Sequence, residues 1–355
     1  MRGFNRQAWA VAMGYIGAVV GAGFASGQEI VQFFVVFDRY GLYGVLLSGA
    51  LFAAMGALLF YICHRSRING YQRVIRTLFG PRWGKLTDTL FSLFLFLGVC
   101  TMFSASGAVF YEHLYLNKTL GIGLTYLATI LLLAGGVRGL VFSYNLLVPI
   151  KILLLLSIAG CGAFGIKNYA QIPAAYALLF GYQYWAMAAV LYVAYNFALA
   201  TAVLPEYQPL VNMRNGTAGA IGGGLGLGLM LCIYYLALSN FSPAVLHYEV
   251  PMLLIAGQVG TGAKLAYVCV LWIGILTTAL ANGYGLAQRV SDLTGIPYSA
   301  SLCLIMTTAL PLSFRSFASL VGTVYPLFGL LGISIMAGVI YRFVKVLSSP
   351  DIQKG

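Results

Sequence analysis

The stretch GAGFASGQE, residues 21–29, lies inside an apolar run that extends from about residue 8 to residue 36. A membrane-spanning helix needs about 20 apolar residues, so the run is long enough to cross a bilayer. Its glycines weaken a helix, and Ser26, Gln28 and Glu29 must be solvated or paired at membrane depth. The stretch therefore predicts a broken spanning helix. Irregular backbone at that depth is tolerated only where protein or a water-filled cavity satisfies it, so we expect a polar solute to bind there.

The composition of the 355-residue chain indicates that lipid surrounds most of its surface. Apolar residues make up 61% of the chain and charged residues only 8%, whereas about a quarter of a soluble domain is charged. The net charge is +12, but the basic residues fall in short gaps between apolar runs, which excludes a nucleic-acid-binding stripe. The six cysteines stand singly, so we expect neither a disulfide framework, nor a metal site, nor a cofactor.

The apolar runs predict an all-α membrane protein, because they are continuous and do not alternate as barrel strands would. The ten predicted spans are roughly 8–36, 41–63, 87–111, 118–136, 140–166, 181–205, 217–240, 262–288, 297–314 and 320–343. The first is interpreted as a retained span and not as a cleaved signal, because its apolar run continues past Ser26 and further spans follow it.

The distribution of basic residues predicts the orientation. With the amino terminus inside, most loop Lys and Arg residues lie on the inner side, many of them in residues 63–86. Basic residues are in excess in cytoplasmic loops. We therefore expect a multi-pass protein of the cytoplasmic membrane with both termini in the cytoplasm, and a short helix at the lipid headgroups within residues 63–86.

The sixth predicted span carries a second unusual stretch, AYNFA at residues 194–198, followed by Pro205. Ten spans divide into two repeats of five, about 8–166 and 181–343, within a single transmembrane domain, residues 1–355. Spans one and six are then equivalent, and a pair of interrupted segments in corresponding positions indicates a transporter binding site. Because each repeat has an odd number of spans, the two repeats are inverted relative to each other.

This pattern resembles the amino acid, polyamine and organocation transporter superfamily with the LeuT-type fold, and GAGFASGQEI is similar to its YkvI-type branch of bacterial membrane proteins. The resemblance implies alternating-access transport of a small amino acid or related amine. It implies that unwound backbone and a half-helix end hold the solute carboxylate. The matching residues are Gly21, Ala22, Gly23, Phe24, Ala25 and Ser26, faced by Tyr195, Asn196 and Phe197. Phe197 stands where that pattern has glycine.

The eighth span contains GILTTA at residues 274–279, which is similar to the sodium-coordinating run of LeuT-type proteins. The alternative to sodium binding is a hydrogen bond from each threonine back to its own helix. By matching position, the implied sodium site consists of Gly17, Val20, Gly274, Thr277 and Thr278.

Lys151 lies near the middle of the fifth span, too deep for its stem to reach the headgroups easily. In proton-coupled members of the superfamily that the chain resembles, a fifth-helix lysine fills the space of a sodium ion. An ammonium there would repel Na⁺, so the two assignments exclude each other. We favour Lys151 bonded to Thr277, Thr278 and helix-one carbonyls, with transport that is H⁺-coupled or cation-independent through Lys151. Na⁺-coupled symport is the alternative.

The remaining assignments are broader. Gln28 and Glu29 could form an outer gate, partner a basic residue or contact a substrate amine. The sequence holds no catalytic motif, so we do not expect an enzyme. A ligand sensor on the same scaffold is the main alternative to a transporter, and the sequence does not give the oligomeric state.

Overall fold

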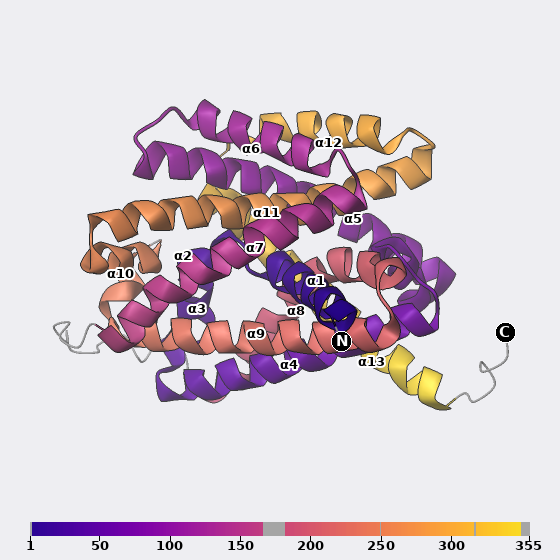
Figure 1. Ribbon diagram of the computed structural model, residues 1–355, viewed down its shortest axis with the longest axis horizontal. Helices are drawn as coiled ribbons and strands as arrows, with labels where there is room; N and C mark the ends of the chain where they lie inside the picture. The colour runs from indigo at the N-terminus through magenta and orange to yellow at the C-terminus, as the bar shows by residue number, and fades with distance from the viewer. Residues whose placement is uncertain (1, 166–181, 249, 316, 349–355) are drawn as a thin grey trace.

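The computed structural model describes residues 2–165, 182–248, 250–315 and 317–348, and the regular structure within these ranges is entirely helical (Figure 1). The α-helices are α1 (Arg2–Val19), α2 (Ala22–Ser26), α3 (Gln28–Phe33), α4 (Arg39–Arg65), α5 (Tyr71–His113), α6 (Lys118–Leu133), α7 (Val137–Gly160), α8 (Trp185–Val203), α9 (Met213–Asn240), α10 (Pro251–Val259), α11 (Thr261–Thr294), α12 (Tyr298–Ser313) and α13 (Phe317–Ser348). The shorter 3-10 and π segments are η1 (Val35–Phe37), η2 (Cys161–Gly165), η3 (Tyr182–Tyr184), η4 (Leu204–Leu210) and η5 (Ala244–His247).

The helices pack as two groups. Helices α1 and α4 each pack on both α8 and α9, and these four helices form what we call the α9 bundle, whereas α5, α6, α11 and α12 form the α11 scaffold. Figure 1 shows α4 and α9 side by side along the lower edge and the scaffold helices in the upper part. Helices α7 and α13 contact both groups. The break after α1 lies where the bundle meets the scaffold, because α2 packs on α11.

The glycines of α9 allow the bundle helices to approach closely. A β-carbon at Gly223 would lie 3.1 Å from Ala12 Cα on α1, and one at Gly228 would lie 2.8 Å from Gly49 Cα on α4. Small residues at such positions let helix backbones touch, as in membrane helix pairs. The glycine-rich seventh span is therefore a packing surface.

The first predicted span is broken, as its sequence indicates. Helix α1 ends at Val19, and the backbone leaves the helical pattern at Val20 and Gly21 before α2 begins. Gly27 then adopts a left-handed conformation with φ of 80° and separates α2 from α3. Glycine takes this conformation without the steric cost of a β-carbon. The break therefore consists of two short helices joined to α1 by nonhelical backbone.

The interruption predicted for the sixth span does not fall at residues 194–198. Helix α8 continues through this stretch to Val203, and only then does the chain change to the 3-10 segment η4. The Asn196 amide does not disturb the helix, because it donates to Tyr192 O at 3.0 Å within the same helix. The change of geometry comes at Pro205, which lacks the N–H that a helix interior needs.

Other differences lie at the ends of the predicted spans. Helix α5 begins at Tyr71, well before the predicted span, and Gly80 with φ of 73° divides it into two parts. Its first part falls in the segment where the basic residues predict a headgroup helix.

Helix α10 was not predicted. Among the described residues, six helices are long and apolar enough to cross a membrane, so the count of ten spans stays a prediction. The predicted junction of the repeats, 166–181, lies outside the described residues.

Candidate functional site

The end of α1 exposes backbone oxygens that a continuous helix would satisfy. The last carbonyls of a helix lack an intrahelical partner, and here Gly21 N turns back to Val19 O at 2.8 Å. The Val20 carbonyl instead accepts a hydrogen bond from outside its own helix, from the Lys151 ammonium, at 2.5 Å. A side chain of α7 thus satisfies the backbone at the break.

Lys151 is completely buried on α7 and joins three parts of the fold. Besides Val20 O, its ammonium donates to Thr277 Oγ1 on α11 at 2.8 Å. The Thr277 hydroxyl in turn donates to Gly274 O at 3.0 Å, and Tyr144 of α7 donates to Thr277 O at 3.0 Å. The bundle, the scaffold and α7 therefore meet at one ammonium group.

The residues of the predicted sodium site are brought together, but the Lys151 ammonium bonds to two of their oxygens. Thr278 donates to Gly274 O at 3.1 Å within its own helix. Its hydroxyl also packs against the break, because a β-carbon at Gly21 would lie 2.5 Å from Thr278 Oγ1. Gly17 lies against α7, where Val148 would meet an added β-carbon. Val20 O and Thr277 Oγ1 are the two oxygens that a sodium ion and the ammonium would share.

The residues predicted to bind the solute, 21–26, differ in how far they are buried. Phe24 is fully buried and its ring centroid lies 5.0 Å from that of Tyr234 on α9. The Ala25 carbonyl accepts a hydrogen bond from the Tyr267 hydroxyl of α11. Gly23 and Ser26 are only partly buried, and Ser26 Oγ donates to Gly23 O at 2.8 Å. Gly23 and Ser26 thus remain partly accessible, whereas Phe24 and Ala25 anchor the break to its surroundings.

Glu29 folds back over the break. A β-carbon at Gly23 would overlap Glu29 Oε1, so the carboxyl group lies directly above the Gly23 backbone. Tyr195 and Asn196 of α8 lie close to this carboxyl group. Its other oxygen, Oε2, is shielded from solvent and has no hydrogen-bond partner. The sequence left three roles open for Glu29, as an outer gate, as the partner of a basic residue or as a contact to a substrate amine, and it did not predict this contact with Gly23. The left-handed Gly27 separates the two short helices that carry Gly23 and Glu29.

The residues predicted for the facing wall lie on α8, which packs on α3. Tyr195 and Asn196 are both buried, and both lie close to Glu29. Phe197 is buried in the same turn, and its carbonyl accepts from Thr201 at 2.8 Å.

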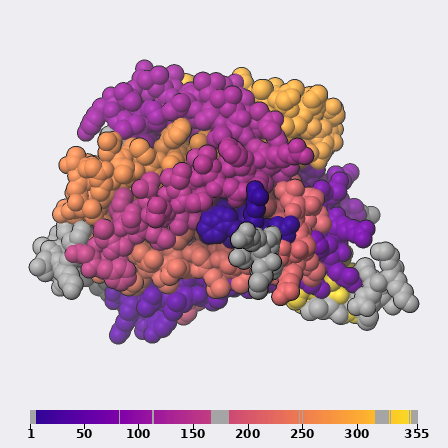
Figure 2. Space-filling model, in the orientation of Figure 1, coloured from indigo at the N-terminus to yellow at the C-terminus, as the bar shows by residue number. Residues whose placement is uncertain are grey.

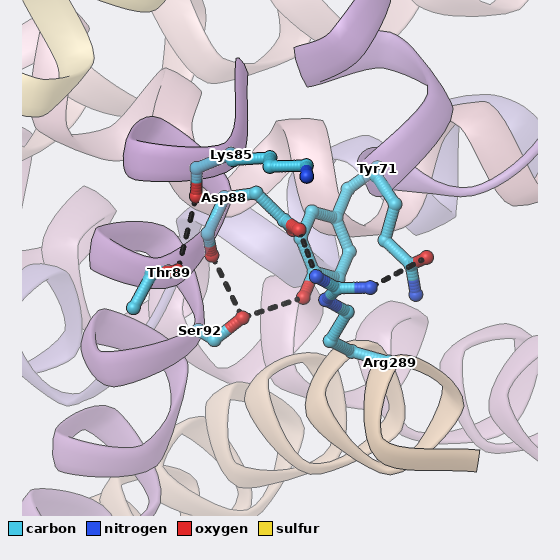
Figure 3. Close-up of polar contacts among 7 residues, drawn as sticks. Tyr71, Lys85, Asp88, Thr89, Ser92 and Arg289 are labelled. Carbon is cyan, nitrogen blue, oxygen red and sulfur yellow. Dashed lines mark hydrogen bonds and ion pairs between the residues drawn. The ribbon is translucent and has the colours of Figure 1, made fainter. Parts of the chain in front are cut away.

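A second polar cluster joins α5 and α11 near the end of α11 (Figure 3). Arg289 forms an ion pair with Asp88 and donates to Gln72 Oε1 at 3.5 Å. In the same cluster Tyr71 and Ser92 share a hydrogen bond of 3.2 Å between their hydroxyls. The ion pair lies within the α11 scaffold, so it ties together two helices of the same group.

One further contact links the bundle to the scaffold. The Tyr284 hydroxyl of α11 donates to Glu206 Oε2 in η4 at 3.0 Å. Sequence patterns did not reveal this contact or the Asp88–Arg289 pair, because the partners are far apart in the chain.

A cavity of about 440 Å³ lies beside the first turns of α1. Helix α1, helix α7 and the end of the sixth span form its walls. The lining residues are Arg6, Gln7, Trp9, Ala10, Val141, Asn145, Tyr207, Leu210 and Val211. Figure 2 shows the start of α1 reaching the surface between α7 and the α8–α9 region. Its volume lies in the range of small-molecule sites.

The chain is 32% identical over 333 residues to the uncharacterized membrane protein YkvI of Bacillus subtilis (strain 168), which covers 92% of this chain and 94% of YkvI. The chain belongs to the YkvI family. It is also 24% identical over 340 residues to YyaD of the same organism, with 96% of each chain covered. No protein-family model matches the chain.

Several solved transporter structures share the fold. A Na⁺-coupled sialic acid symporter in a substrate-bound, outward-open state has a TM-score of 0.67 at 11% identity, covering 95% of this chain and 78% of the symporter. MhsT in complex with L-phenylalanine has a TM-score of 0.62 at 17% identity, covering 92% and 87%. A manganese transporter of Eremococcus coleocola has a TM-score of 0.63 at 11% identity, covering 96% and 78%. The LeuT-type fold is thereby confirmed, and these proteins of the same fold are transporters, not enzymes.

Proposed function

We propose that this member of the YkvI family is a secondary active transporter that moves a small amino acid or a related amine across the cytoplasmic membrane by alternating access, coupled to H⁺ through Lys151. The observation that carries the proposal is the contact of the Lys151 ammonium with both Val20 O and Thr277 Oγ1. In this proposal the chain is one transmembrane domain of two inverted repeats, with both termini in the cytoplasm.

The proton would act on the contact between the bundle and the scaffold. Val20 ends the part of the chain that packs in the α9 bundle, and Thr277 belongs to the scaffold helix α11. Hydrogen bonds from an ammonium group are roughly twice as strong as neutral ones. Loss of the proton therefore weakens both contacts at once and favours separation of the break from α11. If Lys151 binds its proton with different affinity in two conformations of the transporter, protonation shifts the equilibrium between those conformations.

The solute would bind at the break, between residues 21–26 and the Tyr195–Phe197 turn of α8. Gly23 and Ser26 are the accessible part of this set. Proteins with this fold bind small organic solutes, such as the L-phenylalanine of MhsT. That likeness supports a small organic solute. The residues at the break would supply the polar groups that bind it.

Na⁺-coupled symport is the second candidate, because Val20 O and Thr277 Oγ1 are hard oxygen ligands and the sialic acid symporter of the same fold is Na⁺-coupled. The ammonium and a sodium ion would compete for these two oxygens. A buried positive charge repels a second one strongly at such short range, so only one of the two candidates can hold for a charged Lys151.

The test is uptake of a mixed pool of labelled amino acids and amines into proteoliposomes under an imposed H⁺ or Na⁺ gradient. We expect accumulation driven by H⁺ and its loss in Lys151→Ala. Accumulation driven by Na⁺ would overturn the role of Lys151 and favour Thr277 and Thr278 as ligands. Ligand binding without accumulation under either gradient would indicate a sensor. Gly222→Ala, which adds a methyl group where no atom lies within 4 Å, is the matched control.

A further inference from the structure

The Glu29 carboxyl group lies over the Gly23 backbone, within the stretch where the resemblance to LeuT-type proteins implies a solute carboxylate. It lies against Gly23, where any larger residue would displace it. Two carboxylates this close repel each other. The chain's own carboxylate therefore disfavours a solute that presents a carboxylate to the same backbone.

No cationic side chain neutralises Glu29 in the part of the chain that the structure describes. The ion pair found there joins Asp88 to Arg289, and the Lys151 ammonium points to Val20 and Thr277. A buried charge without a partner is costly, and such residues inside a membrane mark functional sites. Glu29 is thus a carboxyl group whose counter-ion must come from elsewhere.

Two buried acceptor oxygens, on Gln28 and Glu29, lack a hydrogen-bond donor. Glu29 Oε2 and Gln28 Oε1 are both buried and have no partner, and the Tyr192 hydroxyl is also unpaired. Tyr192 is close enough to Glu29 for an electrostatic interaction between them. An ammonium group has three donors and no acceptor. It is the chemical group that complements these oxygens.

Three aromatic rings lie on the same side. The ring centroid of Phe33 lies 5.5 Å from that of Tyr192 and 5.8 Å from that of Tyr195, and the two tyrosine rings are 5.7 Å apart. Tyr195 also lies close to the Glu29 carboxyl group. Aromatic faces attract organic cations, and they do so most strongly where water is excluded. A carboxylate beside clustered rings is a recognition site for an organic ammonium ion.

We infer that Glu29 is the counter-ion for the solute ammonium group, so that the central site selects organic amines that lack a carboxylate next to the amine. This inference rests on the proposed function and narrows its substrate class. Gln28 and Tyr192 would orient the remaining N–H donors, and the rings of Phe33, Tyr192 and Tyr195 would pack on the apolar part of the amine.

The test compares amines with the amino acids from which they differ by one carboxylate. The pairs are ethylamine with alanine, 3-methylbutylamine with leucine, and 2-phenylethylamine with phenylalanine. Calorimetric titration of the purified full-length chain measures binding without any requirement for transport. We expect at least one amine to bind at least about ten-fold more tightly than its amino acid, and Glu29→Gln to weaken that binding at least about ten-fold.

Two variants control for charge and folding. Asp292→Asn removes one negative charge from an exposed position on α11 and should leave amine affinity within about two-fold. Glu29→Asp keeps the charge on a shorter stem and should retain more affinity than Glu29→Gln, even if both lower the thermal midpoint. Tighter binding of the amino acid in every pair, no amine binding, or an unchanged affinity in Glu29→Gln would each overturn the inference. Amine binding without accumulation would overturn only the transport proposal.

Discussion

Lys151 and Glu29 both reach the break in helix one, but their surroundings differ. The Lys151 ammonium donates to two oxygens, on the break and on α11. The Glu29 carboxyl group keeps one buried oxygen without a partner. A buried charge whose hydrogen bonds join two elements holds parts of the fold together, whereas a buried oxygen without a donor is free to accept a hydrogen bond from a bound ligand. The comparison separates a coupling group from a recognition group within one site.

Replacing Lys151 should have the largest effect on transport and on stability. Lys151→Met keeps most of the stem volume but leaves Val20 O and Thr277 Oγ1 without their donor, and each unpaired buried acceptor costs about 1–3 kcal/mol. We expect loss of H⁺-driven accumulation and a lower thermal midpoint. Gradient-driven uptake and thermal unfolding of the purified variant measure the two effects. Full H⁺-driven accumulation in Lys151→Met would contradict the assignment of Lys151 as the coupling group.

The Gly23 contact gives a second test, on the Glu29 side. Gly23→Ala adds a β-carbon where Glu29 Oε1 lies, so the carboxyl group must move. We expect about a ten-fold loss of amine affinity with H⁺ coupling retained, because the Lys151 contacts do not involve Gly23. Titration and uptake measure these separately. Gly222→Ala adds the same methyl group to an open position and should bind normally.

The Tyr284–Glu206 contact allows a second comparison, between a contact that joins η4 to the scaffold and one that lies within the scaffold. Tyr284→Phe removes a hydrogen bond of 3.0 Å between them, worth about 1 kcal/mol, or roughly five-fold in a two-state equilibrium. We expect faster alkylation of a cysteine introduced at Asn145, in the cavity wall. The Asp88–Arg289 pair lies within the scaffold, so Asp88→Asn should lower stability without changing that rate. Equal rates in all three proteins would contradict this division.

The smallest effect is expected at Thr278. Within the described residues, the Thr278 hydroxyl bonds only to Gly274 O of its own helix, whereas Thr277 Oγ1 accepts from Lys151. Thr278→Val should change H⁺-driven accumulation by no more than about two-fold, and Thr277→Val by considerably more. Parallel uptake assays compare the two. A larger effect at Thr278 would favour the sodium site over the ammonium.

The break in helix one could be predicted because its cause is local. Glycines and polar side chains inside one apolar run signal a loss of helical geometry at membrane depth. The same reasoning failed for the sixth span, because the Asn196 amide satisfies a carbonyl of its own helix. Pro205 was the better signal, since its missing N–H acts on the backbone whatever surrounds it.

The contacts of the site were only partly accessible from sequence. Lys151 stood out because a mid-span charge is rare. The placement of Glu29 over Gly23 depends on the turn at Gly27, and no spacing rule gives the direction of a side chain after such a turn. The Asp88–Arg289 and Glu206–Tyr284 contacts join distant segments. Each of these residues looked like an ordinary polar group at the end of a span.

The glycine contact between α4 and α9 has a mechanical consequence. Where Gly49 and Gly228 meet, backbone touches backbone and no layer of side chains can be compressed. Helices of 27 and 28 residues are about 40 Å long at 1.5 Å per residue. We therefore expect α4 and α9 to tilt together as one rigid body, so that a displacement of the pair at one membrane face also moves its ends at the other face. Bending would then be confined to the softer joints at Val20–Gly21 and at η4.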